Sequence, residues 1–319
     1  MKVISAEQVQ QKLNFDELIP LLKSSFSQPF HMPQRQVFGL APEDNHNHDA
    51  FALLPSWNEE VIGNKAFTYF PDNAVSYDLP GLFSNIMLFK RQTGEPLALV
   101  DGTSVTYWRT AAISALASQL LSKQDSKHLM LFGTGNLASY LIKAHLTVRQ
   151  LNQVTLSGRN SDKVDGLIAQ FSALYPDVSF VASTDVDKEI AAADIIVCAT
   201  GAKTPLFNGN NLTAGTHIDC LGNHIVDARE CDTTTVVRAR VFVDSLTNTL
   251  AEAGELLIPM TEGSFTPNEI IGELADMCKN PELLRQSDDE ITLFKSVGTA
   301  ISDLVAAYQV VQKVSSLSN

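Results

Sequence analysis

The order of hydrophobic and polar positions divides the chain into two regions with different rhythms. In residues 14–27, apolar side chains recur at helical spacing after an asparagine that can cap a helix, which predicts an N-terminal helix. Short β-rich runs separated by turn residues follow within 36–102. Residues 104–123 then form one long stretch with small side chains along one face, typical of a helix that leads out of a first domain.

From residue 128 the pattern changes to alternating strands and helices. Six strands are predicted, at 128–133, 153–158, 178–183, 193–200, 216–222 and 240–245. Such alternation predicts a doubly wound parallel sheet of the Rossmann type. The last segment, 287–314, adds a short strand, a glycine and an amphipathic helix, and its simplest path returns to the first domain. We therefore expect an α/β fold with domains at 1–118 and 119–290, the first completed by 291–319.

Composition narrows the possible partners of the chain. The 319 residues carry a formal net charge of −13, which argues against nucleic acid or an anionic membrane as a partner but not against a small anion bound by a few arginines. No apolar run reaches the ~18 residues that a membrane span needs, and the N-terminus lacks a signal-like apolar core. The four cysteines have no metal-ligand spacing and are expected to be reduced thiols. We expect a cytoplasmic protein.

A glycine-rich turn, G-x-G-x-x-A at 133–138, joins the first of the six strands to a predicted helix. Gly133 makes the tight turn, Gly135 lets the backbone approach a pyrophosphate, and Ala138 lets helix and strand pack closely. The amide groups at the start of the helix then face the anion. The turn therefore predicts a dinucleotide-binding domain.

The end of the second of these strands bears on cofactor choice. It carries Ser157, Gly158, Arg159 and Asn160, and no carboxylate that would bind a ribose 2′-hydroxyl and repel a 2′-phosphate. Arg159 can pair with that phosphate or stack on the adenine, so we expect NADPH to be preferred to NADH. The alternative is that Arg159 is a solvated turn residue.

Five segments together resemble the ornithine cyclodeaminase and mu-crystallin family over nearly the whole chain. They are MPQR (32–35), GNKAFTYFP (63–71), GEPLALVDGTSVTYWRTAAISALA (94–117), FGTGNLA (132–138) and SDDEITLFKSVGTAISDL (287–304). The resemblance implies a homodimer formed through the N-terminal α/β domain, which also holds the substrate. It implies hydride exchange at the α-carbon of an amino or imino acid, with no metal.

The same resemblance assigns three basic residues to the substrate. Arg35 is expected to grip the substrate carboxylate with its planar fork. Lys65 is expected to bind that carboxylate or to deliver a proton to an imine nitrogen, and Arg109 with Thr110 to lie between substrate and nicotinamide. For each residue the alternative is an ordinary surface charge.

Further residues are assigned to the cofactor by resemblance. Besides Gly133, Gly135, Arg109 and Thr110, they are Asn136 and Leu137 at the pyrophosphate, Gly158, Arg159 and Asn160 at the adenine ribose, Thr200 after the fourth strand, Asp219, Cys220 and Leu221 at the end of the fifth, and Val297 and Gly298 beside the nicotinamide ribose.

One departure from the family pattern narrows the expected reaction. His224 stands where cyclodeaminases carry an aspartate that handles protons, and an imidazole lacks the fixed charge that stabilises iminium intermediates. Cyclodeamination is therefore disfavoured, unless Asp227 substitutes. Reduction of a preformed cyclic imine needs only a carboxylate clamp and a proton from His224 or Lys65. His224 as a structural loop residue is the alternative.

The expected function is that of a ketimine reductase. It would reduce 1-pyrroline-2-carboxylate to L-proline, or 1-piperideine-2-carboxylate to L-pipecolate, and would fit proline metabolism or hydroxyproline degradation. Two alternatives remain: an alanine-dehydrogenase-like reductive amination of 2-oxo acids, and a mu-crystallin-like protein that binds NADPH and a small ligand without turnover. The three basic residues together argue against the second.

Other polar clusters in the sequence are not expected to carry chemistry. His31, His46, His48 and Asp49 suggest a polar hairpin turn rather than a metal site. The acidic run from Asp288 to Glu290 is expected to provide helix or turn electrostatics rather than a general acid and base.

Overall fold

The computed structural model describes residues 1–40 and 49–316 and divides the chain into two compact units. Unit 1 comprises residues 1–110 and 299–319, and unit 2 comprises residues 111–298. The chain passes between them inside helix α4 (Gly102–Leu121) and again after Gly298. These boundaries differ from the expected ones at 118 and 290, because α4 continues from one unit into the other and the strand after residue 290 belongs to unit 2.

Unit 1 contains a mostly antiparallel sheet. Its described strands follow the order β1-β6-β5-β4-β3-β2, with β1 (Lys2–Ile4), β2 (Gln36–Gly39), β3 (Ala50–Trp57), β4 (Val61–Tyr69), β5 (Leu82–Lys90) and β6 (Pro96–Asp101). β1 pairs parallel to β6, and the other pairs are antiparallel. The strands expected within 36–102 are confirmed. β1, with three residues, is too short to leave a periodic signal in the sequence.

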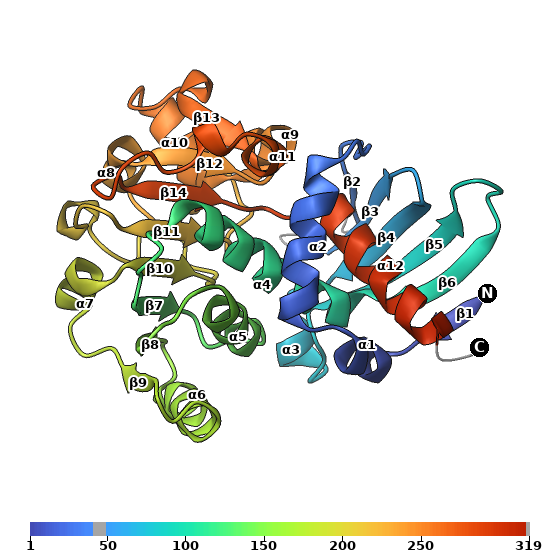
Figure 1. The fold of residues 1–319 in the computed structure, drawn as a ribbon, viewed down its shortest axis with the longest axis horizontal. Coiled ribbons are helices and arrows are strands. Elements are labelled where there is room, and N and C mark those ends of the chain that lie inside the picture. Colours follow the sequence, from blue (N-terminus) through green and yellow to red (C-terminus); the bar gives the residue numbers. More distant parts are fainter. Residues whose placement is uncertain (41–48, 317–319) are drawn as a thin grey trace. The chain divides into compact units, whose positions relative to one another are not determined.

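Three helices of unit 1 pack together on one face of this sheet: α1 (Ala6–Lys12), α2 (Phe15–Ser27) and α12 (Ala300–Ser316). A further short helix, α3 (Asn73–Ser76), lies in the connection between β4 and β5. α2 begins as predicted, because the Asn14 side chain accepts a hydrogen bond of 2.9 Å from the amide of Glu17. α12, near the C-terminus, packs against α2 and against β3 and β4 (Figure 1). The expected return of the C-terminal helix to the first domain is therefore seen.

Unit 2 contains a parallel sheet of eight strands, and all of its residues are described. The order is β13-β12-β14-β11-β10-β7-β8-β9, with β7 (His128–Phe132), β8 (Gln153–Ser157), β9 (Ser179–Ala182), β10 (Ile195–Cys198), β11 (His217–Cys220), β12 (Arg240–Val243), β13 (Ile270–Glu273) and β14 (Thr292–Lys295). The six predicted strands are confirmed, as is the α/β class with a Rossmann-like sheet (Figure 1).

Two strands of this sheet differ from the expectation. β13 was not expected, and β14 lies between β11 and β12 rather than leaving with the C-terminal tail. All four residues of β14 are buried, so the strand is a short run without alternation, and its sequence does not reveal which sheet it joins.

Helices connect the strands of unit 2. They are α5 (Ala138–Val148), α6 (Ser161–Leu174), α7 (Val186–Ala192), α8 (Thr233–Arg238), α9 (Leu246–Glu252), α10 (Gly254–Thr261) and α11 (Leu274–Lys279), with 3₁₀ turns at Gly209–Asn211, Pro267–Glu269 and Pro281–Leu283. Because the strands are parallel, the loops that follow them meet at one edge of the sheet, where α/β proteins bind ligands. In the described parts of both units, we find no helix long and apolar enough to cross a membrane.

Candidate active site: a dinucleotide cavity and a basic cluster

A cavity of about 550 Å³ lies at the carboxyl ends of β7, β8 and β10 in unit 2. Six of the residues predicted to bind a cofactor line it: Gly133, Gly135, Gly158, Arg159, Asn160 and Thr200. Asn136 and Leu137 follow directly at the start of α5, just outside the lining. The structure therefore brings together residues from three separate loops around one space.

The glycines of the turn meet different steric demands. Gly133 has φ +114°, and a Cβ there would collide with the carbonyl oxygen of Ala199. At Gly135 an added Cβ would meet nothing within 4 Å, so this backbone is open to a ligand. A Cβ on Gly158 would press against the side chain of Thr134. The turn thus leaves its backbone open to a diphosphate, and the cavity lies at the strand ends, where doubly wound sheets bind dinucleotides.

The part of the cavity beside the end of β8 is basic. Arg159 and Lys163 line it, and no acidic side chain is among the lining residues. Asn160 caps α6 by accepting a hydrogen bond of 3.0 Å from the amide of Lys163, which fixes the first turn of that helix beside the cavity. Lys163 was not predicted, although its place three residues after a capping asparagine was visible in the sequence.

The predicted residues at the end of β11 point their side chains into the protein. Ser114 Oγ donates to Asp219 Oδ2 and lies 3.0 Å from His145 Nε2. Burial raises the pKa of Asp219 well above its usual range and lowers the pKa of His145 to about 3. Because the serine lies between acid and imidazole and all three side chains are buried, this group joins α4 to β11 and α5 and is not a nucleophilic triad.

Cys220 and Leu221 are also buried, and the Cys220 thiol hydrogen-bonds to Cys198 and Cys231. Asp219, Cys220 and Leu221 are not among the residues that line the cavity, so the structure does not bring these three predicted cofactor residues to it.

A buried glutamate, which the sequence did not reveal, holds two loops of this edge together. Glu230 Oε1 accepts hydrogen bonds from the amide and hydroxyl of Thr200, at 2.6 and 2.8 Å. Its Oε2 accepts one of 2.8 Å from the amide of Gly222. Burial, and then the nearby Cys220, raise the pKa of Glu230 to about 8. Thr200 is thus fixed at the cavity by a residue thirty positions later.

Asp244 holds the predicted turn at Val297 and Gly298 in a similar way. Its Oδ2 accepts hydrogen bonds from Ser296 Oγ at 2.8 Å and from the amides of Val297 and Gly298 at 3.0 and 2.6 Å. Asn248 Nδ2 donates to the Gly298 carbonyl at 3.1 Å. Gly298 has φ +90°, which glycine adopts without strain.

In unit 1, a buried carboxylate joins two of the predicted substrate residues. Lys65 Nζ donates to Asp303 Oδ1 at 3.0 Å and to Thr106 Oγ1 at 2.6 Å. Arg109 Nε donates to the same Asp303 oxygen at 3.1 Å. Arg35 is half-buried and near enough for its charge to lower the pKa of Lys65. We call Arg35, Lys65, Arg109 and Asp303 the basic cluster.

The local sequence explains how these side chains meet. Lys65 lies on the face of β4 that α12 covers. Gly63, two residues earlier on that face, leaves room that Leu304 of α12 occupies. Asp303 lies in the first turn of α12, where the helix dipole favours a carboxylate. Asp303 was not predicted; its signal was an acidic residue inside the apolar face of the last helix.

The charges of the cluster are unbalanced toward positive. Burial lowers the pKa of Lys65 to about 8; Asp303 raises it, while Arg109 and Arg35 lower it further. Two of the three hydrogens of the Lys65 ammonium are used, and Arg109 uses Nε, so within the described residues one Lys65 hydrogen and the terminal nitrogens of Arg109 have no protein partner. Such a site attracts a small carboxylate. Thr110, next to Arg109, is half-buried.

A family model described as the ornithine cyclodeaminase/mu-crystallin family matches residues 1–318. The chain belongs to this family. A family relative from Colwellia psychrerythraea, named Delta(1)-pyrroline-2-carboxylate reductase, is 79% identical over 98% of this chain and 99% of its own length. A Bacillus thuringiensis protein of the same name is 33% identical over 98% and 96% of the two chains.

A solved structure of a relative has the same fold as this chain over the whole length of the chain. It is the Thermococcus litoralis Delta(1)-pyrroline-2-carboxylate reductase in complex with NADH and L-proline, which is 29% identical, covers 100% of this chain and 98% of its own, and has a TM-score of 0.92. The fold described above is thus also found in a solved structure that holds NADH and L-proline.

His224, which we expect at the position where cyclodeaminases carry an aspartate, lies on a loop after β11. His224 and Asp227 are both exposed there, while Asn223 beside them is buried. The proton-handling role expected for His224 stays a prediction.

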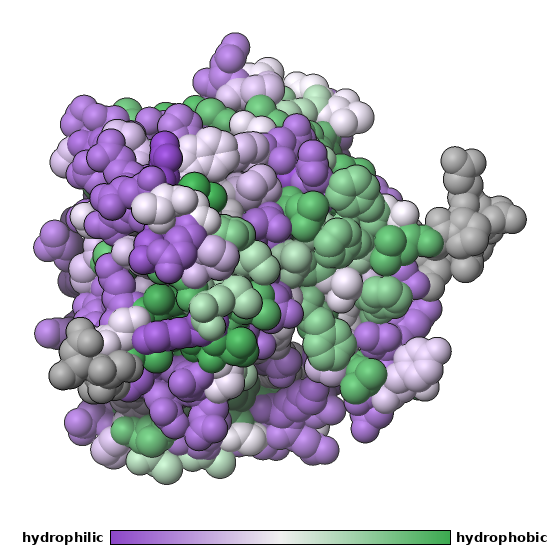
Figure 2. Space-filling model, turned by 90° about the vertical axis from the view of Figure 1, so that its right-hand side faces the viewer, coloured by the Kyte–Doolittle hydropathy of each residue, from purple (hydrophilic) through white to green (hydrophobic). Residues whose placement is uncertain are grey.

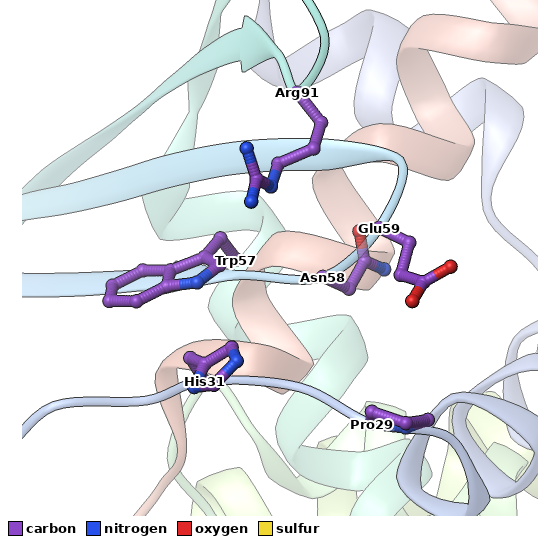
Figure 3. Close-up of a pocket in the computed structure, with 6 residues that line it drawn as sticks. All are labelled: Pro29, His31, Trp57, Asn58, Glu59 and Arg91. Atoms are coloured by element: carbon purple, nitrogen blue, oxygen red, sulfur yellow. The ribbon is translucent and has the colours of Figure 1, made fainter.

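A separate cavity of about 330 Å³ in unit 1 contains none of the predicted site residues. Figure 3 shows Arg91 directed toward Trp57 from one side and His31 on the other, and the rings of His31 and Trp57 stack with centroids 5.2 Å apart. His46 and His48 lie outside the described residues. Among residues 1–40 and 49–316, no group of histidines, cysteines and acids is arranged to hold a metal ion.

Proposed function

We propose that the chain is a ketimine reductase that reduces 1-pyrroline-2-carboxylate to L-proline, with NADPH preferred to NADH. The observation that carries this proposal is the basic cluster, in which one carboxylate fixes Lys65 and Arg109 and leaves donors for a ligand. The names of the Colwellia and Thermococcus relatives support the same reaction. Reduction of 1-piperideine-2-carboxylate to L-pipecolate is the corresponding reaction for a six-membered ring.

The residues of the basic cluster have different roles toward such a substrate. The terminal nitrogens of Arg109, together with Arg35, bind the carboxylate, which compensates the surplus positive charge. A bound nicotinamide supplies the hydride to the ring carbon of the imine. Lys65 donates the proton that has no protein partner to the ring nitrogen. The C=N bond thereby becomes CH–NH, and the Lys65 side chain is left as a neutral amine. His224 is the alternative donor.

The proposed preference for NADPH rests on the basic end of the cavity. Arg159 and Lys163 line it without an acidic neighbour in the lining. Two cations can pair with a 2′-phosphate, whereas a ribose 2′-hydroxyl gains little from them.

The outer face of the unit 1 sheet supports a homodimer. Alternating positions on β3, β5 and β6 place Phe51, Leu53, Phe83, Met87 and Leu99 on the face opposite α12, and each is half-buried or exposed. Figure 2 shows apolar side chains gathered in a patch on this unit. A sheet face of this kind is normally covered, and a second copy of the chain would cover it with the same face.

The deciding experiment follows oxidation of NADPH and NADH with 1-pyrroline-2-carboxylate, 1-piperideine-2-carboxylate, or pyruvate with ammonia. We expect rapid oxidation with the cyclic imine, faster with NADPH, and loss of at least 100-fold in Lys65→Met but not in the exposed control Lys23→Met. Turnover with pyruvate and ammonia alone would replace the proposal with an alanine dehydrogenase. NADPH binding without any turnover would favour a binding protein.

The dimer is tested by light scattering after size exclusion. We expect the wild-type chain to have twice the mass of one copy and Met87→Glu to be shifted toward the monomer. Leu174→Glu, which adds the same charge at an exposed apolar position of α6 in unit 2, serves as the control. A wild-type chain with the mass of one copy would contradict the dimer.

A further inference from the structure

Asp303 is the negatively charged member of the basic cluster, and the proposed reaction gives it no contact with substrate. Its side chain is 1% exposed, and Oδ1 accepts from Lys65 at 3.0 Å and from Arg109 at 3.1 Å. Oδ2 is buried and has no hydrogen-bond partner among the described residues. One oxygen of the carboxylate therefore contacts both cations and fixes the position of one relative to the other.

We propose that Asp303 is a positioning residue that aims Lys65 and Arg109 at the substrate from one shared oxygen and supplies the negative charge that keeps the Lys65 amine protonated. The inference rests on the proposed reduction of an imine, in which Lys65 is the proton donor. Asp303 itself does not touch the substrate.

The hydrogen bonds of the cluster determine direction as well as contact. An ammonium has three donors in tetrahedral arrangement, and Thr106 and Asp303 take two of them, which fixes the direction of the third. Thr106 is itself held, because its hydroxyl donates to the Gly102 carbonyl at 2.7 Å. The bond from Arg109 Nε to Asp303 holds one edge of the guanidinium and leaves its terminal nitrogens for a carboxylate.

The charges around Lys65 come from three segments of unit 1. Arg109 on α4 and Arg35 before β2 are positive, and both disfavour the ammonium form, as does burial. Asp303 on α12 is the negative charge that opposes them. The balance holds the pKa of Lys65 near 8, so that the donor is charged at neutral pH and still acidic enough to give up its proton. Loss of the Asp303 charge would leave a neutral amine.

The first test uses variants that change the charge of residue 303 and the hydrogen bonds of Lys65 separately. Asp303→Asn keeps the shape and removes the charge, so we expect the alkaline limb of the kcat profile to move from about pH 8 down by at least one unit. At pH 7.5 that shift lowers kcat at least about threefold, and we expect KM for the imine to rise. Asp303→Glu keeps the charge and should restore the position of the limb at least in part. Thr106→Val removes the neutral partner of Lys65, so it should lower kcat while the limb stays near pH 8.

A second readout does not depend on turnover. In protein labelled with carbon-13 at the lysine ε position, the Lys65 signal is assigned by its loss in Lys65→Met, and its titration midpoint is followed. We expect a midpoint near pH 8 in the wild-type chain and a midpoint at least one unit lower in Asp303→Asn, with NADPH binding retained as evidence of folding. An unchanged midpoint would overturn the role of Asp303. A shifted midpoint in a protein that reduces no imine would instead refute the proposed function.

Discussion

Lys295 Nζ lies 2.9 Å from Glu255 Oε2, and neither side chain has any exposed surface. Lys295 also donates to the Asn223 carbonyl at 2.8 Å, and Glu255 Oε1 accepts from the Glu230 amide at 3.1 Å. Through these two hydrogen bonds the pair contacts Asn223 and Glu230, and Glu230 in turn bonds the loops at Thr200 and Gly222. Removing one partner of such a pair leaves a buried charge without compensation.

Lys295→Met should lower the free energy of unfolding by about 3–5 kcal/mol, as is typical when one partner of a buried ion pair is lost. The double variant Lys295→Met with Glu255→Gln keeps an acceptor for the Glu230 amide but carries no buried charge, so it should recover part of that loss. Urea unfolding of both variants measures the difference. Equal losses in the two variants would show that packing, rather than charge, dominates at this site.

Gly133→Ala should abolish NADPH binding. The residue has φ +114° and its Cβ would strike the Ala199 carbonyl, so the turn must shift. Gly166→Ala in α6 is the matched control, because an added Cβ there meets nothing within 4 Å. That change should stabilise the protein by about 0.5–1 kcal/mol. Fluorescence titration with NADPH and thermal melting provide the two measurements; tight binding by Gly133→Ala would contradict the assigned turn.

The cavity's basic end should decide between the two cofactors. Arg159→Ala and Lys163→Ala should each raise the Kd of NADPH about 10-fold or more, and should leave that of NADH within about twofold. Added salt should reduce the preference of the wild-type chain for NADPH, because part of it is electrostatic. Equal weakening of both cofactors would show that the two side chains contact a part common to NADH and NADPH.

Asp244→Asn should weaken cofactor binding without unfolding the protein. In Asp244→Asn, the place of the oxygen that accepts from Ser296, Val297 and Gly298 is taken by a neutral amide oxygen, which accepts more weakly, or by an NH2 group, which cannot accept. We expect a cost of about 1–3 kcal/mol, seen as a raised Kd for NADPH. Asp177→Asn, at an exposed position, is the control. A Kd equal to that of the control would mean that the 296–298 turn does not meet the cofactor.

The buried His145 predicts a specific pH dependence of stability. Its pKa is about 3 in the folded protein, because burial disfavours the charged ring, against an ordinary value of 6.5. Between these values the unfolded chain binds the proton and the folded chain does not, so the histidine lowers stability as the pH falls from 6.5 toward 3. The free energy of unfolding, measured with urea from pH 6.5 to 5, should fall less steeply in His145→Gln, by up to about 1.4 kcal/mol per pH unit. Parallel slopes would contradict the prediction.

Local signals in the sequence were sufficient for most of the fold. The helix after Asn14, the alternation of strands and helices after residue 128, and the glycine turn at 133–138 depend on periodicity, capping and backbone freedom within a few residues. The short strand that became β14 was expected, but its place in the sheet was not, because four consecutive buried residues indicate a strand and not its neighbours. Its place between β11 and β12 is decided by tertiary packing.

The residues that organise the candidate site were harder to predict, because each acts on residues distant in the chain. Asp303 meets Lys65 across 238 positions and Arg109 across 194. Asp244 reaches the turn at Gly298 across 54 positions. The place of Asp303 on the apolar face of the last helix indicates that it is buried, but only the fold shows which side chains the two aspartates meet. The basic residues were found because they stand in stretches typical of the family.

The discontinuity of unit 1 sets an order for the assembly of the protein during translation. β4 and the first part of α4 leave the ribosome early, yet the carboxylate that joins Lys65 to Arg109 belongs to α12, which follows all of unit 2 in the chain. Unit 2 is one continuous segment and can fold while synthesis proceeds. A nascent chain thus has every residue of its dinucleotide cavity before the basic cluster can close, and Lys65 and Arg109 acquire their shared carboxylate only after α12 has emerged.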